Sequence, residues 1–167
     1  MMRFQIISVG RLDAPYLREG VETYLRRLRP YAQVTWQQVP DEAVPARPRP
    51  ADVERIQAVE AERIQGVLDR LPGHVYTVAL TRRGWAMTSP QLAQHLDQVA
   101  VDGFSTTAWL IGGTVGLAPQ LVERAHLRLS MSTLTFPHQM MPLLLLEQLF
   151  RACRIQRGEP YHYSAEV

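Results

Sequence analysis

The residues with the clearest chemical potential lie in the last third of the chain. Three glycines follow an apolar run in the segment Gly112-Gly113-Thr114-Val115-Gly116, a polar segment runs from Met131 to Gln139, and Tyr161 and His162 stand near the end. The glycine cluster is similar to a nucleotide-binding loop, but it is neither Gly-x-Gly-x-x-Gly nor a Gly-Lys-Ser/Thr phosphate loop. Two interpretations stay open from this feature alone: a tight turn that needs a positive φ, and a loop that binds a ligand.

The single cysteine and the positions of the acidic residues limit the kinds of catalytic or metal site that the sequence predicts. A single cysteine, Cys153, excludes an internal disulfide and a multi-cysteine zinc site, and its leucine-rich helical surroundings predict a buried structural thiol. Asp and Glu fall mostly on the predicted surfaces of helices, so the sequence singles out neither paired carboxylates for hydrolysis nor a Ser-His-Asp triad. We predict that the protein uses no metal.

The charge of the chain is a weak indicator of a nucleic-acid partner. Its 18 cationic side chains, all arginine, face 16 acidic ones, for a formal net charge of +2. Arginine suits phosphate groups because its planar fork donates two parallel hydrogen bonds. Three arginine clusters, at 26–29, 47–49 and 151–157, contain no acidic residue. Each by itself is more typical of a solvated face than of an RNA contact.

Hydrophobic periodicity predicts the strands and helices that must position these residues. Apolar runs predict strands at 4–9, 75–80 and 106–111, and alternating apolar and polar residues predict strands at 34–39 and 127–131. Apolar residues three and four apart predict helices at 15–28, 51–71, 90–100, 119–125 and from 142 to just before 158. We expect Ser89 to cap the third helix with Pro90 at its first position. Four prolines between 40 and 50 predict a flexible loop.

This alternation predicts one α/β domain over residues 1–167, with a parallel-rich sheet covered by helices on both faces. Ligands of such sheets bind outside the carboxyl ends of the strands, so we expect a pocket formed by the loops at 80–85, 112–116 and 131–139. No apolar run reaches the roughly 18 to 20 residues of a membrane span, and the first residues lack the features of a signal peptide. We therefore expect no membrane attachment and a cytoplasmic location.

Four segments of the last third occur in an order and at a spacing that resemble a known family. They are Leu-Ile-Gly-Gly at 110–113, Leu-Ser-Met-Ser-Thr-Leu-Thr-Phe-Pro-His-Gln at 129–139, Leu-Leu-Glu-Gln-Leu-Phe-Arg-Ala at 145–152 and Gly-Glu-Pro-Tyr-His at 158–162. Val-Gly at 9–10 and Pro-Tyr-Leu-Arg-Glu-Gly at 15–20 also agree. Nearly the whole chain resembles the RlmH family of ribosomal RNA large-subunit methyltransferases, which belongs to the SPOUT class.

The resemblance implies a SPOUT-type α/β fold with a deep C-terminal trefoil knot, which periodicity cannot predict. It further implies that S-adenosylmethionine donates a methyl group to N3 of a pseudouridine in 23S rRNA, conventionally numbered 1915, and that the enzyme is a homodimer acting on assembled ribosomes. Two other functions stay open. One is a non-catalytic RNA-binding or ribosome-assembly module, and the other is a SPOUT methyltransferase with a tRNA target.

The resemblance also implies roles for individual residues. The family's cofactor contacts correspond to Leu80, Gly112, Met131, Ser132, Thr133, Leu134, Thr135 and Phe136. His162 and Tyr161 are the favoured candidates for positioning the substrate or accepting its proton, ahead of His138 and Glu147. Arg151 is a candidate contact to an rRNA phosphate or to the cofactor carboxylate. Because it stands four residues after Glu147, an ion pair within one helix is the other interpretation.

Two further features bear on these expectations. Four consecutive leucines at 143–146 point around the last helix and cannot all face one small core, so we expect a second subunit to bury the surplus.

The chain also departs from the family at Pro142, Phe150 and Val115, where an arginine, a tyrosine and a polar or acidic residue are usual. The proline suits the start of a helix but removes a cation near the expected pocket.

Overall fold

A five-stranded parallel sheet forms the centre of the molecule. The structure, a computed structural model, describes residues 1–163, and residues 164–167 lie outside the described part. The strands are β1 (Arg3–Val9), β2 (Gln33–Val39), β3 (Val75–Ala86), β4 (Thr106–Ile111) and β5 (Leu127–Ser130). They lie in the order β2-β1-β4-β3-β5, and each pairing is parallel. The predicted parallel sheet is confirmed.

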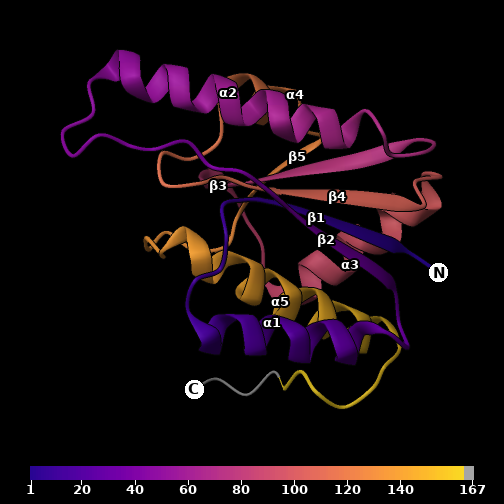
Figure 1. The fold of residues 1–167 in the computed structure, drawn as a ribbon. Coiled ribbons are helices and arrows are strands. Elements are labelled where there is room, and N and C mark those ends of the chain that lie inside the picture. Colours follow the sequence, from indigo (N-terminus) through magenta and orange to yellow (C-terminus); the bar gives the residue numbers. More distant parts are fainter. Residues whose placement is uncertain (164–167) are drawn as a thin grey trace.

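Helices cover both faces of this sheet, as expected. On one face lie α1 (Pro15–Leu28), α3 (Ser89–Val101) and α5 (Met141–Gln156), and on the other lie α2 (Pro50–Leu68) and α4 (Pro119–Arg124) (Figure 1). Successive side chains of a strand point to opposite faces. Ile6 and Trp109 therefore pack against the first group of helices, whereas Ile7 and Leu110 pack against the second. Because both faces of the sheet are covered, β1 and β4 at its centre are buried almost throughout, polar residues such as Gln5 and Thr107 included.

Each of the five α-helices has a proline in its first turn, where the missing N–H costs no hydrogen bond. The expected cap of α3 was wrong by one residue, because Thr88 caps it rather than Ser89. Thr88 Oγ1 accepts from the Gln91 backbone N–H at 3.3 Å, and Gln91 Oε1 accepts from the Thr88 N–H at 2.8 Å. The hydroxyl of Ser89 instead donates to Gln148 Oε1 of α5 at 2.6 Å.

Strand β3 is longer than the sequence predicted. It was expected to end at Leu80, but after an excursion over 81–84 the ladder with β5 resumes at Trp85, which pairs with Leu129 as Leu80 does. Gly84 allows this return, because a Cβ at that position would lie 2.7 Å from both the carbonyl carbon and the oxygen of Arg128. Residues 81–84 are therefore held against β5 by the strand that follows them, rather than forming an independent loop.

The remaining expectations concern single segments. Residues 40–49 contain no helix or strand, and Arg63 of α2 holds their start through a 2.9 Å hydrogen bond to the Pro40 carbonyl; the flexibility of this segment stays a prediction. Cys153 is buried, which confirms the structural thiol, and burial raises its pKa to about 11. Within residues 1–163, no helix is long and apolar enough to cross a membrane, and no group of three or more His, Cys, Asp or Glu side chains could hold a metal ion.

Candidate active site

A cavity of about 940 Å³ opens at the carboxyl ends of β3, β4 and β5. Its walls come mainly from residues 80–83, 111–117 and 131–141, the three segments that the sequence predicted to meet, and Gln57 of α2 and Val122 of α4 complete them. Seven of the eight predicted cofactor contacts line it: Leu80, Gly112, Met131, Ser132, Leu134, Thr135 and Phe136. Thr133 is exposed and does not line the cavity. The sequence therefore located this pocket nearly completely.

The glycine loop is a tight turn and a cavity wall at the same time. Of its three glycines, only Gly116 has a positive φ, of 76°, and its N–H donates to the Gly113 carbonyl at 3.0 Å. Gly112 is required for a different reason, since a Cβ there would lie 2.6 Å from the carbonyl carbon of Gly116 and 2.7 Å from the nitrogen of Leu117. A valine at position 112 would therefore disturb the fold as well as the cavity wall. Any side chain at 112 collides with the backbone of its own turn.

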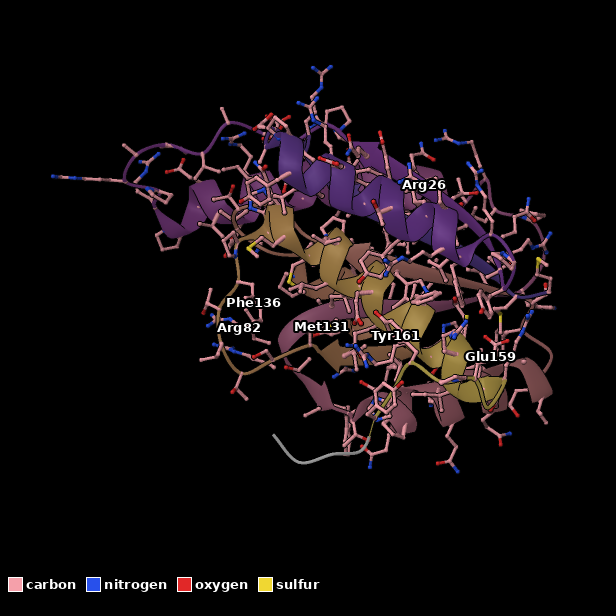
Figure 2. All side chains as sticks on the ribbon, turned by 90° about the horizontal axis from the view of Figure 1, so that it is seen from below. Arg26, Arg82, Met131, Phe136, Glu159 and Tyr161 are labelled. Atoms are coloured by element: carbon pink, nitrogen blue, oxygen red, sulfur yellow. The ribbon has the colours of Figure 1, made fainter. Side chains whose placement is uncertain are left out.

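The loop at 131–136 is stabilised by its own hydroxyl groups. Ser132 Oγ accepts from the Leu134 N–H at 3.0 Å, and Arg82 of β3 donates to Thr135 Oγ1 at 2.6 Å. These bonds leave Leu134 69% exposed and Phe136 36% exposed, although both line the cavity. Figure 2 shows Arg82 and Phe136 next to each other at this end of the molecule. The cavity wall thus includes apolar side chains that are partly exposed to solvent.

Four of the five predicted catalytic residues meet elsewhere, on α5 and the segment after it. Arg151 Nη2 and Glu147 Oε1 form an ion pair at 2.5 Å, which confirms the i, i+4 interpretation. Tyr161 donates its hydroxyl to the same Glu147 oxygen at 3.0 Å, and the Arg151 guanidinium lies 4.7 Å from the centre of the Tyr161 ring. His162 Nδ1 lies 3.4 Å from Arg151 Nη1. We call Glu147, Arg151, Tyr161 and His162 the tail cluster.

The path of the chain after α5 brings Tyr161 and His162 to this position. Gly158 has a φ of 63°, which ends the helix and reverses the chain. Arg154 then holds the returning segment, donating to the Pro160 carbonyl at 2.7 Å and pairing with Glu159 at 2.8 Å. Phe150 contacts the rings of Tyr24, Tyr31 and Tyr161 edge-on, so the phenylalanine found in place of the family's tyrosine is part of an aromatic cluster.

The tail cluster does not lie at the cavity of its own chain. Met141, the first residue of α5, lines the cavity, whereas Arg151 is ten residues further on, or about 15 Å along the helix axis. In Figure 2, Tyr161 and Glu159 lie further along α5 than Met131 and Phe136. Among the predicted catalytic residues, His138 alone lines the cavity, where it begins the short 3₁₀ turn η1 (His138–Met140). Within one subunit, the predicted site is therefore divided into two parts, the cavity and the tail cluster.

Burial affects the chemistry of the tail cluster. Removal from water, the hydrogen bond with Tyr24 and the charge of Glu147 raise the pKa of Tyr161 above its ordinary value. The Tyr161 phenol therefore stays protonated at neutral pH and acts as a hydrogen-bond donor. It is a poor candidate for the base, which leaves His162 and Glu147 as the candidate bases of the cluster.

Comparison with known proteins assigns the family. A family model described as "Predicted SPOUT methyltransferase" matches residues 2–162. The chain is 49% identical over 162 residues to the ribosomal RNA large subunit methyltransferase H of Moorella thermoacetica, covering 97% of this chain and 99% of that relative. It is 44% identical over 161 residues to the protein of the same name from Symbiobacterium thermophilum, covering 96% and 99%. The chain belongs to the RlmH family of SPOUT methyltransferases.

Solved structures agree with this assignment at the level of the fold. A methylase family protein from Haemophilus influenzae Rd KW20 superimposes with a TM-score of 0.50 at 12% identity, covering 99% of this chain and 72% of that one. Another from Neisseria gonorrhoeae gives a TM-score of 0.50 at 14% identity, covering 99% and 87%. The SPOUT-type α/β fold class is confirmed for this RlmH family member. The trefoil knot stays a prediction.

A buried carboxylate behind the glycine loop, that of Glu60, is not among the predicted site residues. Glu60 of α2 is only 3% exposed; its Oε2 accepts from the Glu42 N–H at 3.0 Å, and its Oε1 has no hydrogen-bond partner among the described residues. A Cβ on Gly113 would lie 3.3 Å from this Oε1. Burial, together with the charge of Asp41, raises the pKa of Glu60. The signal was present in the sequence, because Glu60 stands between Ile56 and Ile64 on the apolar stripe of α2.

Proposed function

We propose that this protein transfers the methyl group of S-adenosylmethionine to N3 of pseudouridine 1915 in 23S rRNA, as a cytoplasmic homodimer that acts on assembled ribosomes. The observation that carries the proposal is the cavity, in which seven of the eight residues expected to contact the cofactor come together from three separate segments. The relatives, named for methylation of large-subunit ribosomal RNA, support the substrate.

The cavity fits S-adenosylmethionine, which supplies an already activated methyl group when bound. Its volume lies within the range of about 300–1,000 Å³ of small-molecule sites. Leu80, Leu134 and Phe136 offer apolar surface for adenine and for the thioether side of the cofactor. The described lining contains no Asp or Glu but does contain Arg82 and Arg83, which suits the cofactor carboxylate or an rRNA phosphate.

The reaction needs positioning and removal of one proton. Held in line, the target nitrogen meets the methyl group without covalent help from the protein, and a base near N3–H assists the step. We assign the base to His162 and the orientation of the tail to Tyr161, with Arg151 as the contact to phosphate. Glu147 fixes Arg151 and Tyr161 through its two contacts to them. His138, at the cavity wall, is the alternative base.

A dimer would reunite the two parts of the site. No member of the tail cluster lines the cavity of its own chain, and Arg151 lies about 15 Å along α5 from Met141 at the cavity wall, so we propose that the tail of one subunit faces the cavity of the other. Leu145 and Leu146 are buried, whereas Leu143 and Leu144 are only partly buried, which leaves apolar surface on α5 for a second subunit. Sedimentation at micromolar concentration should give a species of twice 19.0 kDa. A monomer under these conditions would contradict the composite site.

The decisive experiment is transfer of labelled methyl groups from S-adenosylmethionine to intact ribosomes, free rRNA and tRNA, together with calorimetric binding of the cofactor. We expect binding, and transfer to ribosomes alone. Binding with transfer to tRNA would identify a different SPOUT enzyme, and no binding would indicate a non-catalytic RNA-binding or ribosome-assembly module. Leu134→Asp should lower cofactor affinity at least tenfold without altering stability. Val101→Asp, at a similarly exposed apolar residue of α3, is the matched control and should alter neither.

A further inference from the structure

The segments that line the cavity are unusually free of negative charge. The chain has 16 acidic residues, yet none occurs between 75 and 96 or between 125 and 146. The first stretch contains all of β3 and most of α3, and the second contains β5 and the loop at 131–136. Both stretches carry arginine, at Arg82, Arg83 and Arg128. The cavity mouth and its surroundings therefore present positive charge that no neighbour in these segments offsets, a pattern that suits a polyanion.

An exposed tryptophan stands at the edge of this surface. Trp85 is 74% exposed, whereas Trp109 is completely buried and Trp36 is partly buried with its Nε1–H donating to Ser8 Oγ at 2.8 Å. Tryptophan is normally largely buried, so the exposed indole of Trp85 offers a ring face that is available to a ligand. Trp85 also borders a shallow hollow of about 370 Å³, which it shares with Met87, Gln91, Gln94 and His95.

The excursion of β3 places this tryptophan next to the cavity. Arg83 is exposed and lines the cavity, and Trp85 follows two residues later, about 7 Å along an extended chain. Gly84, between them, packs on the backbone of Arg128, and Trp85 pairs with Leu129 of β5. The segment is therefore fixed to the sheet, and its arginine and indole are presented with little freedom of the backbone.

We propose that Arg83 and Trp85 form an RNA contact beside the cavity, in which Trp85 stacks on an unpaired base and Arg83 contacts a phosphate of the same strand. This inference rests on the proposed function, because it takes the polyanion to be the rRNA that supplies the target nucleotide. An aromatic platform combined with arginine and without acidic neighbours is the arrangement that binds single-stranded nucleic acid. The contact would hold a nucleotide adjacent to the one being methylated.

The first test measures the stacking directly. A short single-stranded oligoribonucleotide should quench the fluorescence of Trp85, and Trp85→Phe should abolish most of this signal because the other two tryptophans are less accessible. Trp85→Ala should weaken oligoribonucleotide binding about 5- to 100-fold and raise the KM for ribosomes similarly. Its affinity for S-adenosylmethionine should stay unchanged, since Trp85 does not line the cavity in the described structure. Val101→Ala is the control for loss of an exposed apolar side chain.

The second test measures the phosphate contact. Arg83→Ala should reduce the slope of log affinity against log salt by about 0.7, the value for one phosphate contact to a single strand. Arg70→Ala is the matched control, because Arg70 is exposed in the turn before β3, at the opposite edge of the sheet from the cavity. The control should leave the slope unchanged.

The outcomes separate this inference from the function on which it rests. Wild-type methyl transfer with unchanged RNA binding in Trp85→Ala and Arg83→Ala would overturn the inference and leave the proposed function standing. RNA binding that depends on Trp85 without any methyl transfer to ribosomes would overturn the proposed function and support the contact. Conversion of a dimer into a monomer by Trp85→Ala would show that the surface binds a second copy of the chain, which also overturns the inference.

Discussion

Replacing Gly112 by alanine should destabilise the protein through a collision within its own turn. The added Cβ would lie 2.6 Å from the carbonyl carbon of Gly116 and 2.7 Å from the nitrogen of Leu117, whereas ordinary contacts of a Cβ begin at 3.4 Å. The backbone at 116–117 must therefore move by about 0.8 Å, since both atoms belong to the main chain and cannot rotate away. Overpacking of this kind costs about 1–3 kcal/mol. We therefore expect the free energy of unfolding to fall by about 1–3 kcal/mol.

Urea denaturation followed by circular dichroism measures this change, provided that the slope against urea stays the same. Gly66→Ala in α2 is the matched control, because nothing lies within 4 Å of the added Cβ and alanine favours a helix over glycine. This control should raise the free energy of unfolding by about 0.5–1 kcal/mol. Equal stability of Gly112→Ala and the wild type would refute the argument from the turn.

Cofactor binding by the same variant tests the second role of the loop. Because the displaced residues 116–117 line the cavity, a folded Gly112→Ala protein should bind S-adenosylmethionine more weakly than the wild type. Calorimetry at a temperature where the variant is fully folded separates this effect from unfolding. Wild-type affinity would remove the glycine loop from the proposed binding site.

Three further predictions concern the tail cluster and two buried groups. Deleting the chain from Tyr161 onward should lower methyl transfer to ribosomes by about 10²- to 10⁴-fold. The affinity for S-adenosylmethionine should stay unchanged, since no described residue of this segment lines the cavity. Equal loss of methyl transfer and of cofactor affinity would show that the tail is structural. Burial raises the pKa of Glu60, so its protonated form stabilises the fold below about pH 4.5, the ordinary value, and that contribution is lost as the pH rises toward the folded-state pKa. The stability of the wild type relative to Glu60→Gln should therefore fall between pH 4 and pH 7 in thermal melts, and parallel pH profiles would contradict this. Cys153, with its pKa raised from 9.0 to about 11, should react with iodoacetamide at pH 8 about 100-fold or more slowly than an exposed thiol, and rapid alkylation of the native protein would show that the helix opens.

The order of the elements and the two faces of the sheet could be predicted from local patterns. Ile6 and Ile7 already indicate a strand buried on both sides, and the prolines mark the first turns of the helices, because these signals depend on neighbours in the sequence. The exact residue at which a helix begins is harder to predict. Thr88 and Ser89 are both capable caps, and the contact of Ser89 with Gln148 of α5, far along the chain, decides between them.

The candidate site was predictable in its membership but not in its geometry. Leu80, Gly112 and the loop at 131–136 follow three strands, and parallel strands bring their carboxyl ends to one edge of the sheet. The resemblance to the RlmH family named the same residues. Neither source indicated that Tyr161 and His162 pack against α5 away from the cavity of their own chain, since that depends on the turn at Gly158 and on the contacts of Arg154.

The sequence by itself determined the α/β architecture, the cavity segments and the family, because apolar periodicity and motif spacing are properties of the chain read in order. Only the tertiary structure decided which strands are neighbours, how β3 leaves and rejoins β5 beside Trp85, that Glu60 is buried behind Gly113, and that the site is divided into two parts. Each of these features depends on a close approach between segments that lie far apart in the sequence. Such approaches are set by packing of the whole molecule, which a local pattern does not encode.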